Sequence, residues 1–387
     1  MHNLYSELHE EYESFGHMQI IPDNCYSPIN YYLLHHGVLK SQNNSTNLSV
    51  VFYGSAPTTS GRSLNDILLS GRVQENIFNI MLRFGKHKIV LTADIKQMFR
   101  QILLDLTQRN LLRILWKNKH WEKPIEYELN IATYGTKSAP FLATRVIKQL
   151  CLDESDDLPL AAEISLSDIY MDDYVTGCEN IENAKILKNQ LIKMFETCGM
   201  TLHKWNSNNS ELLDIEYPIS EKHLFAQLEE CTTKTLGMVW NSKSDTLNFK
   251  VSVKEKTIYT KREVLSTIAK LYDPFGLIGP VITKSKIFLQ KLWLEKINWD
   301  DSLPNILCIE WNNFVSTLKT IENISINRYL LTDNSERIIL LGYCDASIAA
   351  YGAVVYLGSY CKNYTPTTKL LESKSRVTSL KTISIPN

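Results

Sequence analysis

The segment 168–177, Asp-Ile-Tyr-Met-Asp-Asp-Tyr-Val-Thr-Gly, constrains the fold of this chain more than any other. Apolar residues alternate around two adjacent carboxylates, Asp172 and Asp173, and a period of two predicts a tight β-hairpin with the acids at its tip. Two neighbouring anions on a rigid turn repel each other unless a cation lies between them. The alternative interpretation is a polar hairpin tip in water, so other segments must decide between the two.

A third carboxylate, Asp94, ends the apolar run 89–93. A strand that delivers Asp94 beside the hairpin tip would gather three carboxylates, and hard oxygen ligands of this kind suit Mg²⁺. Two ions held in this way can support an in-line phosphoryl displacement. Taken alone, Asp94 is equally an acid that caps the element after its strand.

The order of these segments resembles the reverse transcriptase of BEL/Pao-type LTR retrotransposons. The similarity runs from about residue 30 to the C-terminus and covers these segments, in order: 92–102, 134–142 and 170–173 as three palm motifs, 199–205 after the palm hairpin, 235–240 as primer grip, and 261–280.

The resemblance implies an α+β fold, a right-hand polymerase of fingers, palm and thumb followed by a truncated RNase H-like α/β start. It places fingers and palm in 1–245, a thumb or connection region in 246–335, and an incomplete RNase H-like segment in 336–387. The implied function is an RNA-directed DNA polymerase that adds deoxynucleotides (dNTPs) to a primer on an RNA or DNA template. Two Mg²⁺ ions, with Mn²⁺ as a substitute, are the implied cofactors, and other Pol or Gag products are candidate partners.

The resemblance also assigns catalytic roles. Asp94, Asp172 and Asp173 hold the metals, and Lys204 protonates the departing pyrophosphate as a general acid. A solvated surface lysine is the alternative for Lys204.

Nucleotide contacts are implied for Phe99, Gly135 and Lys137. The Phe99 ring would lie under the sugar and exclude a 2′-hydroxyl, whereas core filling is its ordinary role. Gly135 would let the backbone approach the nucleotide, and a simple turn glycine is the alternative. Lys137 is either a phosphate contact or solvated.

The primer grip is assigned to Leu236, Gly237 and Met238, with an ordinary hairpin strand as the alternative. Trp205 and Trp240 are expected to pack in the core rather than stack on bases. The segment 261–276 predicts a thumb helix that ends at Asp-Pro and Gly. Its apolar face is expected to comprise Val264, Leu265, Ile268, Ala269 and Tyr272, with Lys261 and Lys270 facing nucleic acid.

Near the end of the sequence, 343–347 and 351–356 resemble the opening hairpin of an RNase H domain, and Asp345 matches its first catalytic carboxylate. The helix expected to supply a glutamate would follow Asn387. We therefore expect no working RNase H here, and exposed strand edges within 343–387.

The fingers depart from the family, because Ser49 stands at an arginine position and Tyr53 at an aspartate position. The loss of a finger cation weakens a triphosphate clamp. A degenerate fragment is therefore expected, and the alternative function is a catalytically inactive nucleic-acid-binding remnant of a Pol polyprotein. Proteolysis is excluded, because no Asp-Thr-Gly or Asp-Ser-Gly triplet occurs.

Composition agrees with an intracellular globular protein. The resemblance implies a place in the cytoplasm within a virus-like particle, or in the nucleus. Hydrophobic residues make up 44% of the 387 residues, and the eight cysteines form no C-x-x-C pair. Neither a signal peptide nor a membrane span is evident. The net charge is −1, but the window 248–296 holds ten cations and four acids. Such a window is either a solvated face or a surface that follows nucleic-acid phosphates.

Local patterns predict the elements around these motifs. Apolar residues recur at helical spacing over 64–83, and Ser70-Gly71 interrupts this pattern. A loop is expected at 151–159, before the hairpin. Gly199 is expected to end the second of two later helices. The expected strands are 88–93, 111–116 and 125–129, and the two later helices are 138 to about 150 and 181–198.

Overall fold

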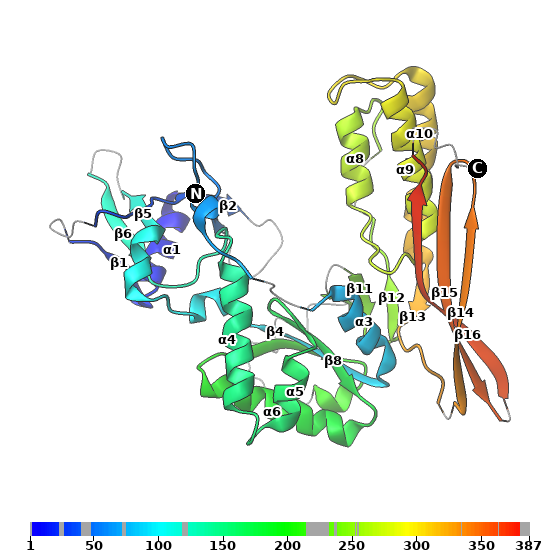
Figure 1. The fold of residues 1–387 in the computed structure, drawn as a ribbon, viewed down its shortest axis with the longest axis horizontal. Helices are drawn as coiled ribbons and strands as arrows, with labels where there is room; N and C mark the ends of the chain where they lie inside the picture. Colours follow the sequence, from blue (N-terminus) through cyan, green and yellow to red (C-terminus); the bar gives the residue numbers. More distant parts are fainter. Residues whose placement is uncertain are drawn as a thin grey trace, which may run out of the picture.

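The computed structural model shows an elongated chain of helices and sheets, as the α+β prediction requires (Figure 1). None of the helices it describes is long and apolar enough to cross a bilayer. The described residues are 2–22, 27–39, 48–71, 75–117, 123–213, 232–235, 238–251, 253, 255–333, 335–362 and 364–379.

One end of the molecule is a helix packed on two small sheets (Figure 1). Helix α1 (His2–Ser14) covers the sheet β1-β6-β5 and the hairpin β2–β3, and their aromatic and aliphatic side chains share one core. The strands are β1 (Met18–Ile20), β2 (Leu34–Leu39), β3 (Leu48–Tyr53), β5 (Arg113–Trp116) and β6 (Ile125–Leu129).

The centre is an antiparallel sheet in the order β7-β8-β4-β9. Its members are β4 (Ile89–Ile95), β7 (Ile169–Tyr170), β8 (Asp173–Cys178) and β9 (Leu202–Ser207). Side chains alternate between its faces. Leu91, Ala93 and Tyr174 point into the core under the helices, whereas Val90 and Val175 belong to a second core on the opposite face.

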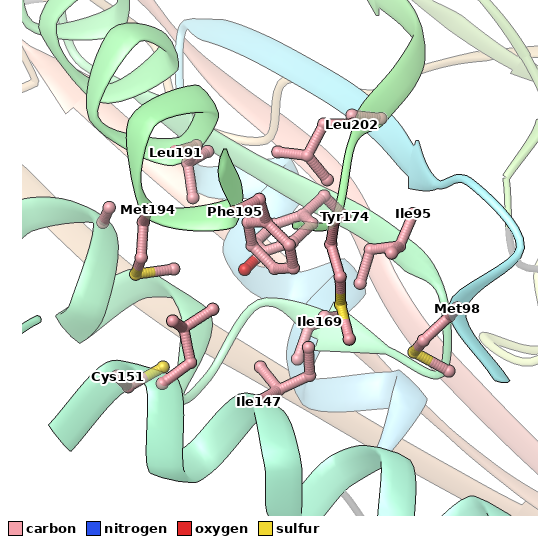
Figure 2. Close-up of a cluster of buried hydrophobic side chains, with 14 of the residues drawn as sticks. Ile95, Met98, Ile147, Cys151, Ile169, Tyr174, Leu191, Met194, Phe195 and Leu202 are labelled. Carbon is pink, nitrogen blue, oxygen red and sulfur yellow. The ribbon is translucent and has the colours of Figure 1, made fainter. Parts of the chain in front are cut away.

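Three helices cover the first face of this sheet: α4 (Ala139–Asp153), α5 (Pro159–Ser165) and α6 (Ile181–Thr197). Figure 2 shows their contact with the sheet, where Ile147 and Cys151 of α4 and Leu191, Met194 and Phe195 of α6 meet Ile95, Ile169, Tyr174 and Leu202. Tyr174 and Phe195 meet edge to face, with ring centroids 5.7 Å apart. Burial of this apolar surface fixes the sheet that carries Asp94, Asp172 and Asp173.

The helix predictions are largely confirmed. Helix α4 begins after Ser138 with Pro140 in its first turn, and α6 is capped by the Asn180 side chain and followed by Gly199 at φ +75°. The segment 64–83 divides as predicted into α2 (Leu64–Ile67) and α3 (Ile77–Lys86). The predicted strand 125–129 is observed as β6, and the predicted strand 88–93 corresponds to β4. The predicted strand 111–116 is shorter than expected, because residues 111–112 belong to a 3-10 turn.

The predicted loop 151–159 is wrong in part. Helix α4 runs on to Asp153, and α5 begins at Pro159. The acidic residues that suggested a loop lie on the exposed side, while Ala161 and Ala162 of α5 are buried. The remaining short turns are η1 (Met98–Gln101), η2 (Leu106–Leu112), η3 (Ser210–Leu212) and η4 (Lys319–Asn323).

A second sheet joins the centre to the rest of the chain. Its order is β10-β11-β12-β13, and its strands are β10 (Thr232–Thr235), β11 (Met238–Asn241), β12 (Thr246–Asn248) and β13 (Ser325–Asn327). Trp240 and Leu247 pack with Phe84, Val90 and Val175 in the second core. The boundary expected between the fingers and palm (1–245) and the thumb or connection region (246–335) therefore falls inside a continuous sheet.

Beyond this sheet, the described residues form the helices α8, α9 and α10 and the long sheet β14-β15-β16 (Figure 1). Helices α8 (Lys261–Ala269), α9 (Gly279–Leu294) and α10 (Asn305–Leu318) enclose a core around Trp311. Strands β14 (Arg337–Ala346), β15 (Ala350–Cys361) and β16 (Tyr364–Val377) form an antiparallel meander. Strand β16 lies against α9, and among the described residues β14 pairs on one side only, with β15.

Candidate active site

The hairpin predicted at 168–177 is present, and its tip carries both acids. Tyr170 pairs with Asp173, so Met171 and Asp172 form the turn. Met171 adopts the left-handed conformation at φ +58°, which tight hairpin turns require. The geometry of the tip is thus set by the backbone of β7 and β8.

Asp94 lies directly opposite Asp173 on the neighbouring strand. Strands β4 and β8 are antiparallel with Asp94 and Asp173 in register, and the Ile95 N–H donates to the Asp172 carbonyl at 2.8 Å. Residues opposite each other in a sheet project from the same face. The structure therefore brings the upstream acid beside the doublet.

Burial and mutual repulsion set the protonation of these carboxyls. Burial, followed by the negative charges of Asp172 and Asp94, raises the pKa of Asp173 to about 7. Burial also raises the pKa of Asp172, with Asp94 adding to the effect. Burial pushes the pKa of Asp94 upward too, but hydrogen bonds from His203 and Lys204 outweigh it and lower that pKa.

Both oxygens of Asp94 are engaged by strand β9. Lys204 Nζ lies 2.6 Å from Oδ2, and His203 Nε2 lies 3.1 Å from Oδ1. His203 was not predicted as a site residue, although it precedes Lys204 in the family-like segment. The only feature of the sequence that pointed to His203 was its position as a titratable residue next to Lys204.

A metal centre is not assembled as the structure stands. Across the described part of the chain, no three His, Cys, Asp or Glu side chains are grouped so that they could hold a metal ion. The donor chemistry still fits a divalent cation, because Asp94 faces Asp173 across the two strands, Asp172 adjoins Asp173, and repulsion among the three acids contributes to the raised pKa values of Asp172 and Asp173. Asp94, Asp172 and Asp173 are the residues that would hold it.

The base of the hairpin is braced by a buried acid, Asp168, that sequence reasoning did not assign. The Asp168 carboxylate accepts from Arg83 Nε at 2.6 Å and from Thr176 Oγ1 at 2.8 Å. Its side chain is only 4% exposed. The guanidinium of Arg83 also donates to the Ser167 carbonyl. Helix α3 thereby fixes the entry of β7, and Asp168 acts as a positioning residue.

Phe99 follows the strand of Asp94 in the short turn η1. Its ring meets the Tyr134 ring edge to face, with centroids 5.9 Å apart, and it packs partly against the central core. Phe99 and Tyr134 therefore lie together beside the strand of Asp94. Exclusion of a 2′-hydroxyl by the Phe99 ring stays a prediction.

Gly135 has a structural reason to be glycine. Its φ is +93°, and a Cβ there would lie 2.0 Å from the Phe52 carbonyl oxygen. Asn65 fixes the same turn, because its amide donates to the Gly135 carbonyl and its oxygen accepts from the Lys137 N–H. The Lys137 side chain is exposed. The close approach seen here is to strand β3.

The finger positions Ser49 and Tyr53 both lie on strand β3, and Tyr53 is exposed. Of the primer-grip residues, Leu236 and Gly237 lie outside the described residues, and Met238 begins β11. Trp205 and Trp240 are buried, which confirms that they pack in the core.

The prediction for the thumb helix is wrong for four residues. Lys261 is buried, with Nζ 3.4 Å from the Trp293 ring centroid, so it packs inside the helical region instead of facing nucleic acid. Leu265, Ala269 and Tyr272, expected on the apolar face, are exposed, because the helix ends at Ala269 and buries only the side that carries Val264 and Ile268.

The basic window 248–296 is partly neutralised by ion pairs. Lys256 pairs with Glu263, Arg262 with Asp300, and Lys291 with Glu310. Among the described residues of this window, the exposed cations for which no ion pair is seen are Lys250, Lys270, Lys284, Lys286 and Lys296. The charge open to a polyanion is therefore smaller than the sequence suggests.

Asp345 lies near the end of β14, opposite Gly352, and is exposed. Its carboxylate accepts from the Ala346 N–H at 2.8 Å.

Residues 260–387 match the family model of the Pao retrotransposon-like RNaseH-like domain. No curated protein matches the chain. RNase H-like domains act on nucleic acid and generally use divalent metal ions. This match relates residues 260–387 to the Pol proteins of Pao/BEL retrotransposons and supports an RNase H-like region there.

Proposed function

We propose that this chain is an RNA-directed DNA polymerase of a retrotransposon, built as fingers, palm and thumb. The observation that carries the proposal is the register of β4 and β8, which sets Asp94 opposite Asp173 and next to Asp172. Three clustered carboxylates repel one another, so folding stability alone favours keeping them apart. The raised pKa of Asp173 illustrates this repulsion.

Residues 1–245 would form fingers and palm, 246–335 the thumb or connection, and 336–387 the RNase H-like segment with Asp345 as its first acid. The β10–β13 sheet would then link palm and thumb, which agrees with a primer-grip role for Leu236, Gly237 and Met238, of which Met238 begins β11. A template–primer duplex would lie along the exposed cations of the 248–296 window.

Asp94, Asp172 and Asp173 would hold two divalent ions, Mg²⁺ or Mn²⁺. When bound, such ions supply charge neutralisation and Lewis acidity for nucleotidyl transfer. The chain's own residues supply the rest. Lys204 would deliver a proton to pyrophosphate, the Phe99 ring would reject a 2′-hydroxyl, and Gly135 and Lys137 would border the dNTP.

A primer-extension assay tests this function. The purified chain is given a primer annealed to RNA or DNA template, the four dNTPs, and Mg²⁺, Mn²⁺ or EDTA. The proposal predicts extension that depends on the divalent ion.

Binding of the duplex without any extension would favour the second candidate, a catalytically inactive nucleic-acid-binding remnant of Pol. The observation that favours this second candidate is the loss of finger charge at Ser49 and Tyr53 on β3.

A further inference from the structure

Strand β9 presents two neighbouring side chains to one carboxylate. In a regular strand, successive side chains point to opposite faces, so His203 and Lys204 could not both reach Asp94. They do reach it, at 3.1 Å and 2.6 Å.

A β-bulge explains this geometry. Thr92 pairs with Asn206 and Asp94 with His203, so β9 contains one residue more than β4 over this stretch. Lys204 accommodates the extra residue at φ +53°. Leu202 and Trp205, on either side of the pair, both point into the central core. Bulges commonly re-aim side chains beside functional sites.

A left-handed lysine is strained, since only glycine and a few polar residues adopt this conformation freely. The packing of the Lys204 side chain does not explain the conformation, because that side chain is 61% exposed. The conformation instead allows the ammonium group to donate a charge-assisted hydrogen bond to Asp94 Oδ2. The bulge thus lets both Leu202 and Trp205 enter the core and also places an ammonium group at the acidic cluster.

We propose that Lys204 is an internal counter-ion of the three carboxylates, which occupies Asp94 Oδ2 until a divalent cation takes its place. This inference rests on the proposed function, because it takes Asp94, Asp172 and Asp173 as the ligands of that cation. His203 keeps its hydrogen bond to Oδ1 and so preserves the orientation of Asp94 during the exchange. A divalent cation takes the place of a singly charged ammonium group, so the acids are never left without a counter-ion.

The exchange predicts that Lys204 competes with the metal. Binding of Mn²⁺ to the chain alone, without nucleotide or nucleic acid, is measured by electron paramagnetic resonance or calorimetry. We expect Lys204→Met to tighten Mn²⁺ binding by about three- to tenfold, the size of effect expected when one exposed charged hydrogen bond is removed.

Two further variants make this comparison specific. Lys193→Met removes an exposed lysine from α6 with the same change of net charge, and it should bind Mn²⁺ as the wild type does. Lys204→Gly removes the ammonium group and also relieves the left-handed strain, so it should fold and should also bind Mn²⁺ more tightly.

Asp94→Asn distinguishes a failure of the counter-ion from a failure of the metal site. If Asp94→Asn weakens Mn²⁺ binding but both Lys204 variants bind like the wild type, the counter-ion is wrong and the metal site stands. If Asp94→Asn leaves Mn²⁺ binding unchanged, the metal site itself is wrong, and the counter-ion is overturned with it. Melting temperature gives a second readout, because added Mn²⁺ should stabilise Lys204→Met more than the wild type.

Discussion

Arg328 binds Asp245 through two parallel hydrogen bonds, Nε to Oδ1 at 2.6 Å and Nη2 to Oδ2 at 2.7 Å. The Arg328 side chain is only 1% exposed, and its guanidinium also donates to the carbonyls of Phe84 and His87. Asp245 accepts in addition from Trp240 Nε1 at 3.0 Å. The segment after β13 is thereby tied to the β11–β12 turn and to the end of α3. This network holds the proposed primer hairpin against the sheet that carries the acids.

Arg328→Met should lower the free energy of unfolding by about 3–5 kcal/mol, because it removes the buried guanidinium that pairs with Asp245 and donates to the carbonyls of Phe84 and His87. Urea denaturation measures this loss. Arg262→Met is a matched control, since Arg262 makes the same two-pronged contact with Asp300, but at an exposed position. Exposed pairs contribute little, so this control should leave stability nearly unchanged. Equal losses in the two variants would contradict the role given to Arg328.

Gly135→Ala should destabilise the chain by about 2–5 kcal/mol, since it adds left-handed strain to a clash with the Phe52 carbonyl. Gly61→Ala provides the control, because Gly61 has φ +76° but open space around the missing Cβ. It should cost only about 1–2 kcal/mol. Thermal or chemical unfolding of both variants separates strain from steric overlap, and similar losses would show that the contact with Phe52 is unimportant.

Stability of the N-terminal part should fall as the pH drops from about 6.5 towards 4. Burial, followed by the nearby charge of His35, lowers the pKa of His9 to about 4. A folded-state pKa below the unfolded one means that the unfolded chain binds the extra proton first, so stability is present above about pH 6.5 and is lost as the pH falls. The loss is on the order of 3 kcal/mol by pH 4.

His9→Phe tests this assignment, because a phenyl ring can keep the stack on Trp116, whose centroid lies 4.6 Å from the His9 ring, but cannot titrate. The variant should show a flatter dependence of melting temperature on pH between about 4 and 6.5. An unchanged pH profile would assign the acid sensitivity to other groups.

Phe99→Val should admit ribonucleotides if the ring excludes the 2′-hydroxyl. The measurement is the ratio of kcat/KM for dNTP and ribonucleotide incorporation, which we expect to fall by at least about tenfold. Phe99→Tyr keeps the ring and should keep selection. Unchanged selection in Phe99→Val would restrict Phe99 to its contact with Tyr134.

Local patterns were sufficient to predict the hairpin at Asp172, the strand of Asp94 and helix α6, because each depends on alternation or helical spacing within one segment. Helix α5 was missed because its surroundings are acidic, and only contact with α4 and α6 makes it bury Ala161 and Ala162. Tertiary burial outweighs local polarity in such a case.

Contacts between residues that lie far apart in the sequence could not be predicted from local patterns. Lys261 looked like a surface cation, yet the rings of Trp293 and Trp299 enclose it. His203 reaches Asp94 only because of the bulge in β9. Arg328 was not predicted as a structural residue, because its partners lie far away along the chain. No local period predicts a β-bulge or a bidentate contact, because each depends on which strands finally pair.

The most direct test of the three-carboxylate centre is single-turnover primer extension by Asp94→Asn, with duplex affinity measured in parallel. Asp156→Asn, which alters an exposed acid outside the sheet, has the same charge change and serves as the control. If the three carboxylates act as one centre, Asp94→Asn slows extension by roughly a hundredfold or more and leaves duplex binding intact, whereas the control stays active. Extension by Asp94→Asn at the wild-type rate would contradict a polymerase centre at these acids.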